Sequence, residues 1–234
     1  MVSIDNVYKT VLNILNKENR GYIVPLEFNT LALQAQSEIF ESYFSLRNYV
    51  VSNDSEYSDI RRNTEEKIAL FENEETIATS TFSNAEGNTT SSYYAYPTNF
   101  YRLSSVSTGG IYVDETTNKN ILYLNRSPLM KPTVKNPLYV RHESGLVIYP
   151  TTGITEILIN YIRKPAEPKW VGGTTAGQII ANTGASDYQN FELHSSEFPE
   201  LVIKILAYAG VIIRAADVAQ AAAAKEQQII QSER

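Results

Sequence analysis

Apolar residues recur every three to four positions over the first third of the chain, which is the spacing of amphipathic helices. The first stripe follows Ser3, a residue type that suits a helix N-cap. Pro25 suits the first turn of a second helix, and a third helical stretch runs over about 59–71. The apolar positions of the first two stripes are Ile4, Val7, Tyr8, Val11, Leu12, Leu15, Phe28, Leu31, Ala32, Ala35, Ile39, Tyr43 and Leu46.

The pattern of polar residues changes after the third helical stretch. Residues 72–92 contain no Lys or Arg and are rich in Ser, Thr, Asn and Gly, which predicts a long loop or the tip of a hairpin. Short β-rich runs separated by turn residues then extend to Arg163, and Glu143-Ser144-Gly145 between two of them is a strong hairpin signal. The predicted strands are 100–106, 111–114, 120–124, 138–142, 146–149 and 156–163.

A last helix is predicted near the C-terminal end. Ser195 or Ser196 can cap it, and Pro199 falls in its first turn. The run from Leu201 to Ile213 is apolar nearly all round, which indicates a central, buried helix.

Two segments with loop-like composition precede this helix. Residues 164–170 contain two prolines and are expected to be extended. Residues 172–187 are rich in Gly, Thr and Ala, and we expect a loop there with a short strand at 178–180. Segments 72–92 and 172–187 both have the composition of chain that becomes ordered on binding a partner.

The order of these elements predicts an α+β protein. Helices at the two ends of the chain should pack on each other as a bundle, with a small antiparallel β-sandwich or barrel inserted between them. The predicted boundaries are 1–75 plus 190–234 for the helical bundle domain and 76–189 for the inserted β domain.

Composition narrows the classes of function. The 234 residues are 43% apolar and 20% charged, so a packed core is expected and wholesale disorder is not. The net charge of −6 argues against a protein that wraps nucleic acid by neutralising phosphates. Cysteine is absent, which excludes disulfides and thiolate metal sites. No secretory signal or membrane span is expected.

None of the common catalytic or phosphate-binding motifs occurs in the sequence. His142 and His194 are the two histidines, and the serines after His194 are better explained as helix caps than as nucleophiles. The acidic pairs 65–66 and 74–75 fit solvated surfaces better than a glycosidase site, whose carboxyls must face each other across a sugar. We therefore expect no enzyme, no cofactor and no metal.

Tyrosine is abundant, with 16 residues, and several tyrosines gather around Pro97. They could stack sugars or form a protein interface, or they could pack on a small sheet. Tyr94, Tyr96 and Phe100 are our candidates for an interface of the β domain.

Three segments carry a resemblance to head-to-tail adaptor proteins, the ring proteins that connect head and tail in short-tailed bacteriophages. They are Tyr-Pro-Thr-Asn-Phe-Tyr-Arg-Leu at 96–103, the strand and proline-rich exit at 159–170, and an acidic start followed by an Ala-rich apolar helix at 191–224. The chain is most similar to those of crAss-like phages.

The resemblance implies a virion protein assembled in the cytoplasm of the host bacterium. Such adaptors form a ring, expected to be twelve-fold, between the portal protein and the next tail component. Double-stranded DNA would pass through the ring without specific binding, which suits a net negative chain. The arm facing the portal would be 221–234, and its contact residues would be Lys225, Glu226, Gln227, Gln228, Ile229 and Ile230.

Two other classes of function compete with the connector. A carbohydrate-binding or adhesin-like β module would use the tyrosine-rich strands to stack sugars. A hydrolase would need two carboxylates that face each other, and the sequence contains no pattern that supplies them.

Overall fold

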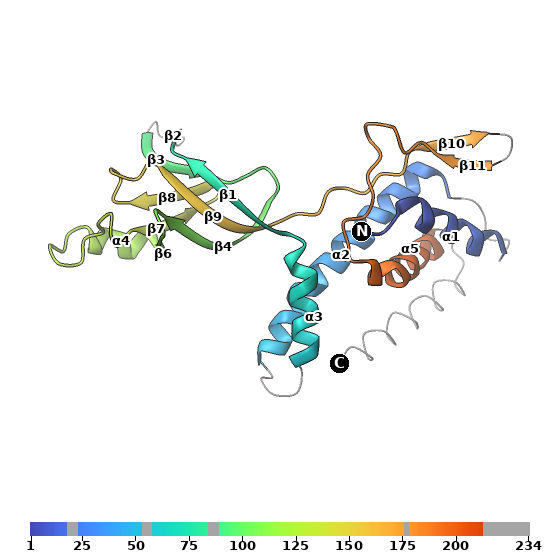
Figure 1. Cartoon of the computed structure of the whole chain (residues 1–234), viewed down its shortest axis with the longest axis horizontal. Coiled ribbons are helices and arrows are strands. Elements are labelled where there is room, and N and C mark those ends of the chain that lie inside the picture. The colour runs from blue at the N-terminus through green and yellow to red at the C-terminus, as the bar shows by residue number, and fades with distance from the viewer. Residues whose placement is uncertain (18–22, 53–57, 84–88, 176–177, 213–234) are drawn as a thin grey trace. The chain divides into compact units, whose positions relative to one another are not determined.

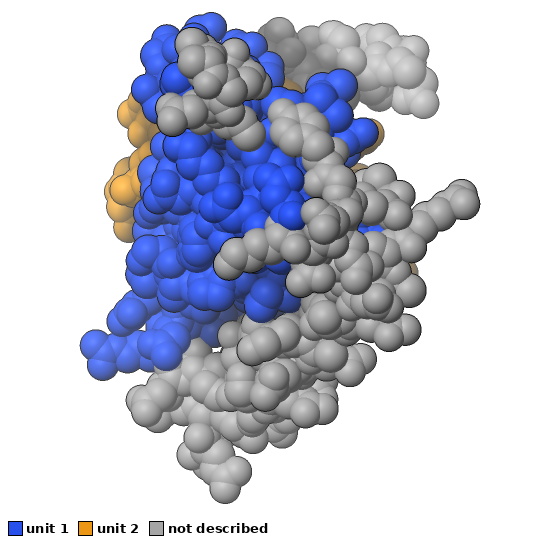
Figure 2. Space-filling model, turned by 90° about the vertical axis from the view of Figure 1, so that its right-hand side faces the viewer, with its two compact units in different colours: residues 1–70, 165–234 blue, residues 71–164 orange. Residues whose placement is uncertain are grey.

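The computed structural model describes residues 1–17, 23–52, 58–83, 89–175 and 178–212 (Figure 1). The chain is an α+β protein, as predicted, and it divides into two compact units. Residues 1–70 with 165–234 form the helical unit, and residues 71–164 form the β unit (Figure 2). The predicted boundaries therefore need a correction, because residues 165–189 lie in the helical unit and 71–75 in the β unit.

The helical unit contains the helices expected at the two ends of the sequence. They are α1 (Ile4–Lys17), α2 (Pro25–Ser52), α3 (Ser58–Ala69) and α5 (Phe198–Ile212). Helix α2 packs against both α3 and α5, and α1 packs against α5. The apolar stripes of α1 and α2 are buried wherever their side chains are described, so helical periodicity identified the core correctly.

The segment that leaves the β unit is fastened to the helical unit by Trp170, which is 2% exposed. Its ring lies 4.5 Å from that of Tyr8, and its indole nitrogen donates to Asp5. The side-chain amide of Asn29 accepts from the backbone N–H of Trp170 and donates to its carbonyl. This pairing imitates a β-ladder, so the extended chain is held without a neighbouring strand.

A second polar link joins α2 to the same region. The amide nitrogen of Gln36, which is 1% exposed, donates to the carbonyl of Ala166, and its oxygen accepts from the backbone N–H of Glu192. The Glu192 carboxylate accepts from the N–H of Ala166. The side-chain amide of Gln36 and the backbone groups that it meets therefore all have hydrogen-bond partners. Residues 166 and 192 are both tied to helix α2 in this way.

The chain before α5 differs from the sequence prediction. Segment 172–187 contains a hairpin of β10 (Gly172–Thr175) and β11 (Gln178–Ala181), of which only the second strand was expected. A 3₁₀ turn, η1 (Ser195–Glu197), comes before α5, and its N-cap is His194 rather than a serine. Pro199 does lie in the first turn of α5.

The β unit consists of two sheets. One has the order β1-β9-β4-β5 and the other β2-β3-β8-β7-β6. All the pairings are antiparallel except that of β6 with β7. The elements are β1 (Glu72–Ala78), β2 (Ser80–Ser83), β3 (Thr89–Ala95), β4 (Phe100–Thr108), β5 (Ile111–Tyr112), β6 (Asp114–Glu115), α4 (Asn118–Leu124), β7 (Leu138–His142), β8 (Gly145–Tyr149) and β9 (Glu156–Arg163).

The chain crosses from one sheet to the other at two places. Strands β1 and β2 belong to different sheets and are separated only by Thr79, whose N–H donates to the carbonyl of Thr155. Strands β5 and β6 change sheets in the same way around Val113, whose N–H donates to Val106. These crossings close two opposite sides of the unit, which therefore combines features of a sandwich and a barrel.

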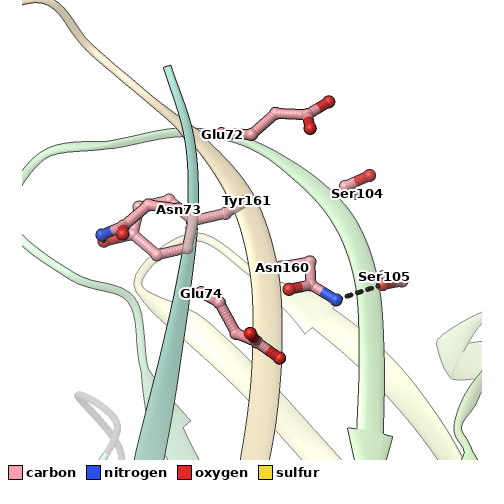
Figure 3. Close-up of a pocket in the computed structure, with 7 residues that line it drawn as sticks. All are labelled: Glu72, Asn73, Glu74, Ser104, Ser105, Asn160 and Tyr161. Carbon is pink, nitrogen blue, oxygen red and sulfur yellow. Dashed lines mark hydrogen bonds between the residues drawn. The ribbon is translucent and has the colours of Figure 1, made fainter. Parts of the chain in front are cut away.

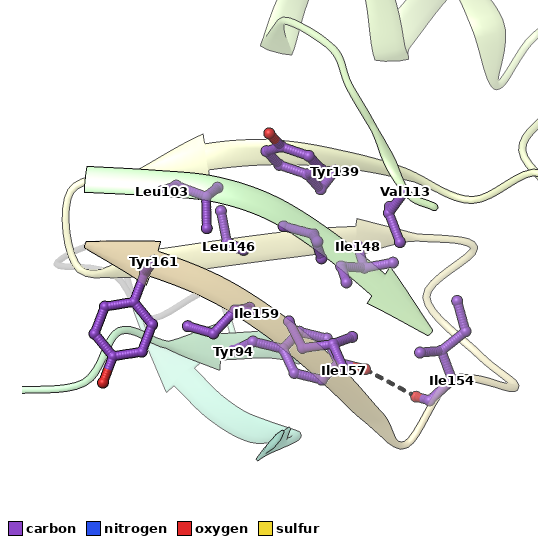
Figure 4. Packing of buried hydrophobic residues seen from close by; sticks show 11 residues of the cluster. Tyr94, Leu103, Val113, Tyr139, Leu146, Ile148, Ile154, Ile157, Ile159 and Tyr161 are labelled. Carbon is purple, nitrogen blue, oxygen red and sulfur yellow. Dashed lines mark hydrogen bonds between the residues drawn. The ribbon is translucent and has the colours of Figure 1, made fainter. Parts of the chain in front are cut away.

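Side chains from both sheets meet in one core between them (Figure 4). The buried residues of this core lie on β3, β4, β7, β8 and β9, and Val113 and Ile154 add to it from the connections between strands. They are Tyr94, Leu103, Val106, Val113, Tyr139, Leu146, Ile148, Ile154, Ile157, Ile159 and Tyr161. Strand β9 lies in the interior of its sheet, and its residues alternate between buried side chains on the core face and half-buried ones, such as Leu158 and Asn160, on the other face.

The predicted hairpin is confirmed in its details. Strands β7 and β8 pair from Leu138 with Tyr149 to His142 with Gly145, which leaves Glu143 and Ser144 as the turn. Gly145 is buried, and a Cβ atom at this position would overlap the carbonyl oxygen of Tyr94. The glycine is therefore required by the close approach of β3, in addition to its place next to the turn.

One secondary-structure prediction was wrong and another was right only in part. Residues 72–92 do not form a long loop: they contain β1, β2 and the start of β3, and the alternative of a hairpin agrees with the antiparallel pairing of β2 with β3. Strand β1 forms because its backbone pairing with β9 outweighs poor intrinsic strand propensity. Residues 120–124 belong to helix α4 and not to a strand. The hydroxyl of Thr117 accepts from the N–H of Asn120 and caps this helix.

The chain enters and leaves the β unit at neighbouring points. The N–H of Arg163 donates to the carbonyl of Phe71 at 2.9 Å, and the guanidinium of Arg163 lies over the Phe71 ring. The first residue of β1, Glu72, pairs with Ile162. The two connections to the rest of the chain therefore start side by side.

Candidate functional site

The residues predicted to contact partners have different positions in the structure. The arm residues 225–230 lie outside the described part of the chain. Tyr94 is 1% exposed and belongs to the core, where its hydroxyl donates to the carbonyl of Ile154. As a surface contact, Tyr94 was the wrong choice. Its position on β3 opposite Leu146 points it inward.

Tyr96 and Phe100 do lie together, at the end of the β unit where the chain enters and leaves it. Their rings stack with centroids 4.0 Å apart and an angle of 11° between the planes. Phe100 also contacts Tyr161, at 5.9 Å between centroids. Both residues are half-buried and pack against the core. They close the end of the sandwich, and only their outer parts can meet a partner.

Charged groups flank this aromatic stack. Arg141 on β7 donates to the carboxylate of Glu115 at 2.8 Å, and the hydroxyl of Tyr139 donates to the same oxygen at 3.2 Å. About half of the Arg141 and Glu115 side chains is exposed. The ion pair is therefore partly screened by water, and we expect it to orient the cluster more than to stabilise it.

Burial raises the pKa of Tyr96 to about 12, although the nearby Arg141 acts in the opposite direction and favours the phenolate. Glu115, Tyr139 and Tyr93 each raise this pKa further by like-charge repulsion. Burial also raises the pKa of Tyr139. Both phenols are therefore protonated at neutral pH, and neither is set up as a base or a nucleophile.

A polar hollow of about 300 Å³ lies on the sheet formed by β1, β9 and β4 (Figure 3). The Asn160 amide donates to the Ser105 hydroxyl at 3.1 Å on its floor. Glu72 and Glu74 line it from β1, on alternate positions of the strand and hence on one face. These groups can accept hydrogen bonds and attract cations, but the hollow contains no base paired with a nucleophile.

Tyr161 borders the hollow with its backbone and points its ring the other way. Its hydroxyl lies 3.1 Å from the Glu75 carboxylate and 3.2 Å from the Asn99 amide oxygen, and it accepts from the Asn73 amide. This network fixes the aromatic end of the unit to strand β1.

The two histidines lie at the end of a strand and at the cap of a helical turn. His142 is exposed at the end of β7. The ring nitrogen Nδ1 of His194 lies 2.8 Å from the hydroxyl of Ser196 and accepts from the Ser196 N–H, as a cap does. Ser196 also contacts Glu197, which forms an ion pair with Lys67. In the described ranges, no three His, Asp or Glu side chains are arranged to hold a metal ion.

Much of the tyrosine-rich surface expected from the sequence is buried. Tyr93, Tyr94, Tyr139 and Tyr161 are each 6% exposed or less. A sugar-stacking platform needs ring faces open to solvent, so this burial counts against the carbohydrate-binding alternative.

An exposed apolar surface was missed by the sequence analysis. It lies in the connection between β6 and β7, where Leu122, Tyr123, Leu129, Met130 and Val134 are between 47% and 92% exposed. The assignment of 120–124 as a strand concealed its helical part, Leu122 and Tyr123, since a helix with only Ile121 buried turns its other apolar residues outward.

No protein-family model matches the sequence, and no curated protein matches it either. Among the described helices, none combines the length and the apolar character that a membrane span requires.

Proposed function

We propose that this chain is a structural virion protein, a head-to-tail adaptor that forms a ring between the portal and the tail of a short-tailed bacteriophage. The observation that supports the proposal is the architecture of the chain. Both chain ends contribute to one helical unit, and a compact β unit is inserted between residues 71 and 164. This is the arrangement that the resemblance in segments 96–103, 159–170 and 191–224 implies.

The two units suit a connecting role because each offers a different surface. The helical unit carries the C-terminal arm, 221–234, which we assign to the portal. The β unit, attached through two neighbouring connections at Phe71 and Arg163, is available for the next tail component. No step of this function requires catalysis or a cofactor.

Double-stranded DNA would pass through the proposed ring without being bound specifically. A net charge of −6 for each chain disfavours lasting contacts with phosphates, which need an excess of cations. We therefore expect the purified protein to leave double-stranded DNA unbound at physiological salt in a gel-shift measurement. Retention of DNA with a steep salt dependence would contradict this part of the proposal.

The direct test is negative-stain imaging of the full chain, alone and mixed with portal rings encoded by the same genome. We expect ring-shaped density stacked on the portal. A variant that ends at residue 220 should lose this density while it keeps its thermal unfolding transition. A wild-type chain that stays a monomer and ignores the portal would overturn the proposal.

A further inference from the structure

The connection between β6 and β7, residues 116–137, is the most unusual surface of the described chain, and we name it the basic loop. It exposes large apolar side chains, of which Leu129 is 92% and Met130 61% exposed. It also contains Lys119, Arg126, Lys131 and Lys135 and no acidic residue. All four cations are exposed, and none forms an ion pair within the described ranges.

The basic loop is a built structure that holds these side chains outward. Helix α4 is capped by Thr117 and anchored by Ile121, which is 2% exposed. Thr133 and Asn136 exchange backbone hydrogen bonds, and Thr116 donates to the carbonyl of Tyr139. The exposure of Leu129 and Met130 is therefore a property of the fold, and exposed apolar clusters of this kind are typical of interaction surfaces.

A surface of opposite charge lies on strand β1, and we name residues 72–75 the acidic edge. Glu72 and Glu74 are exposed, line the polar hollow and form no ion pair with other described residues. Among the strands in the described ranges, β1 pairs only with β9, so no described strand lies beside its outer backbone groups. An edge of this kind is a ready docking line for a second chain.

The basic loop and the acidic edge lie on opposite sides of the β unit. Strands β1 and β2 are the first strands of the two sheets and close one side at Thr79. Strands β5 and β6 are the last strands of the two sheets and close the other side at Val113, and the basic loop follows β6 directly (Figure 1). One copy therefore presents complementary charges in opposite directions.

We propose that the basic loop of one copy docks on the acidic edge of the next copy, in a head-to-tail contact. Complementary patches on opposite sides of a subunit produce a heterologous interface, which closes into a ring when the rotation between the copies allows it. The lysines would face Glu72 and Glu74, and Leu129 and Met130 would supply the apolar centre of the contact. The proposal rests on the proposed ring function and specifies its subunit interface.

Two other acidic partners, DNA and an anionic membrane, would each explain only part of these two surfaces. DNA would engage the cations but would gain little from Leu129 and Met130, since phosphate contacts are electrostatic. An anionic membrane would accept both kinds of side chain but leaves the acidic edge on the other side without a role. A second copy satisfies both surfaces at once.

The test uses charge reversal on the full chain. One variant combines Lys131→Glu with Lys135→Glu, and the other combines Glu72→Lys with Glu74→Lys. By sedimentation velocity at about 0.1 M salt, we expect wild-type chains to self-associate and each variant to do so at least about tenfold more weakly. An equimolar mixture of the two variants should restore association, because each mixed contact again joins opposite charges.

Rescue in the mixture distinguishes a lost contact from a misfolded variant. A matched control, Glu65→Lys with Glu66→Lys on α3, should associate like the wild type. The proposal is overturned if the mixture is not rescued, or if both reversed variants associate normally. It is also overturned if the wild type stays monomeric while its lysines prove necessary for binding to phosphatidylserine vesicles or to duplex DNA.

Portal binding separates this inference from the proposed function. If wild-type rings form on the portal and both charge variants form them equally well, the interface is wrong and the adaptor function stands. If head-to-tail association follows the charges but no chain binds the portal, the interface stands and the adaptor function fails.

Discussion

At the scale of single residues, Gly145 shows how the two-residue turn and the packing of the neighbouring strand depend on one position. Replacement by Ala would place a methyl group against the Tyr94 carbonyl, and backbone cannot give way as a flexible side chain can. We expect Gly145→Ala to lower the free energy of unfolding by about 3 kcal/mol, measured by urea denaturation.

Gly173 provides the matched control for this change. A Cβ atom at Gly173 would meet no heavy atom within 4 Å. Gly173→Ala should therefore stay within about 0.5 kcal/mol of the wild type. Equal effects of the two substitutions would show that the close approach of β3 is not what requires glycine at 145.

The raised pKa of Tyr96 predicts that the folded chain loses stability at alkaline pH. Its pKa is raised to about 12 in the folded chain, against about 10 in the unfolded chain. Between these values the unfolded chain releases the phenol proton and the folded chain retains it. The stabilisation is thus complete below pH 10 and is lost as the pH rises toward 12, with a slope below about 1.4 kcal/mol per pH unit because the ring is partly solvated.

The substitution Tyr96→Phe removes this titration. We expect its unfolding free energy, measured by urea denaturation from pH 9 to pH 12, to fall less steeply than that of the wild type. The remaining decline comes from other tyrosines whose pKa is also raised by burial, Tyr139 among them. Parallel curves for the two proteins would contradict the assignment to Tyr96.

At the scale of elements, the basic loop contains both a residue that stabilises the fold and residues available to a partner. Ile121 is 2% exposed, whereas Leu129 and Met130 are 92% and 61% exposed. We expect Ile121→Ala to cost about 3 kcal/mol of unfolding free energy. The double change Leu129→Ser with Met130→Ser should cost less than about 0.5 kcal/mol, as judged by thermal unfolding.

These two results together decide whether the exposed side chains are held away from the core. A large loss of stability in the Leu129 and Met130 variant would mean that the loop contributes to folding. It would then no longer be a surface reserved for a partner.

The same elements show what sequence patterns can predict. The helices α1 and α2 and the hairpin β7–β8 were predicted closely, because their periodicity and turn residues are local signals. Strand β1 was not, because its polar residues become a strand only through pairing with β9, which is distant in sequence. Trp170 was read only as part of an extended segment, since its partners Asn29 and Asp5 are far away in sequence.

The candidate surfaces follow the same rule. The run of cations without acidic residues from Thr116 to His142 is visible in the sequence, but its exposure depends on α4. The stacking of Tyr96 on Phe100 is a short-range contact that the cluster around Pro97 suggested. The burial of Tyr94 depends on the register of β3 with β8, which local patterns do not determine.

At the scale of the whole molecule, the β unit begins and ends at adjacent points. We therefore expect that it can be excised from the chain. Phe71 and Arg163 are joined by a backbone hydrogen bond, so the unit begins and ends at one place. We expect residues 71–164 to fold alone, with a cooperative thermal transition and dispersed amide resonances in a ¹H–¹⁵N NMR spectrum. A disordered spectrum would mean that the helical unit is needed to form the sandwich.

The side-by-side connections at Phe71 and Arg163 also determine how the β unit responds to mechanical force. Tension that spreads the two connections pulls β1 and β9 apart from their shared end, where the hydrogen bonds between them break one after another. Tension that both connections share acts along the two strands together, and many bonds then carry the load at once. The β unit should therefore unfold at low force when its two connections are pulled apart, and resist a higher force when both are pulled along the strands.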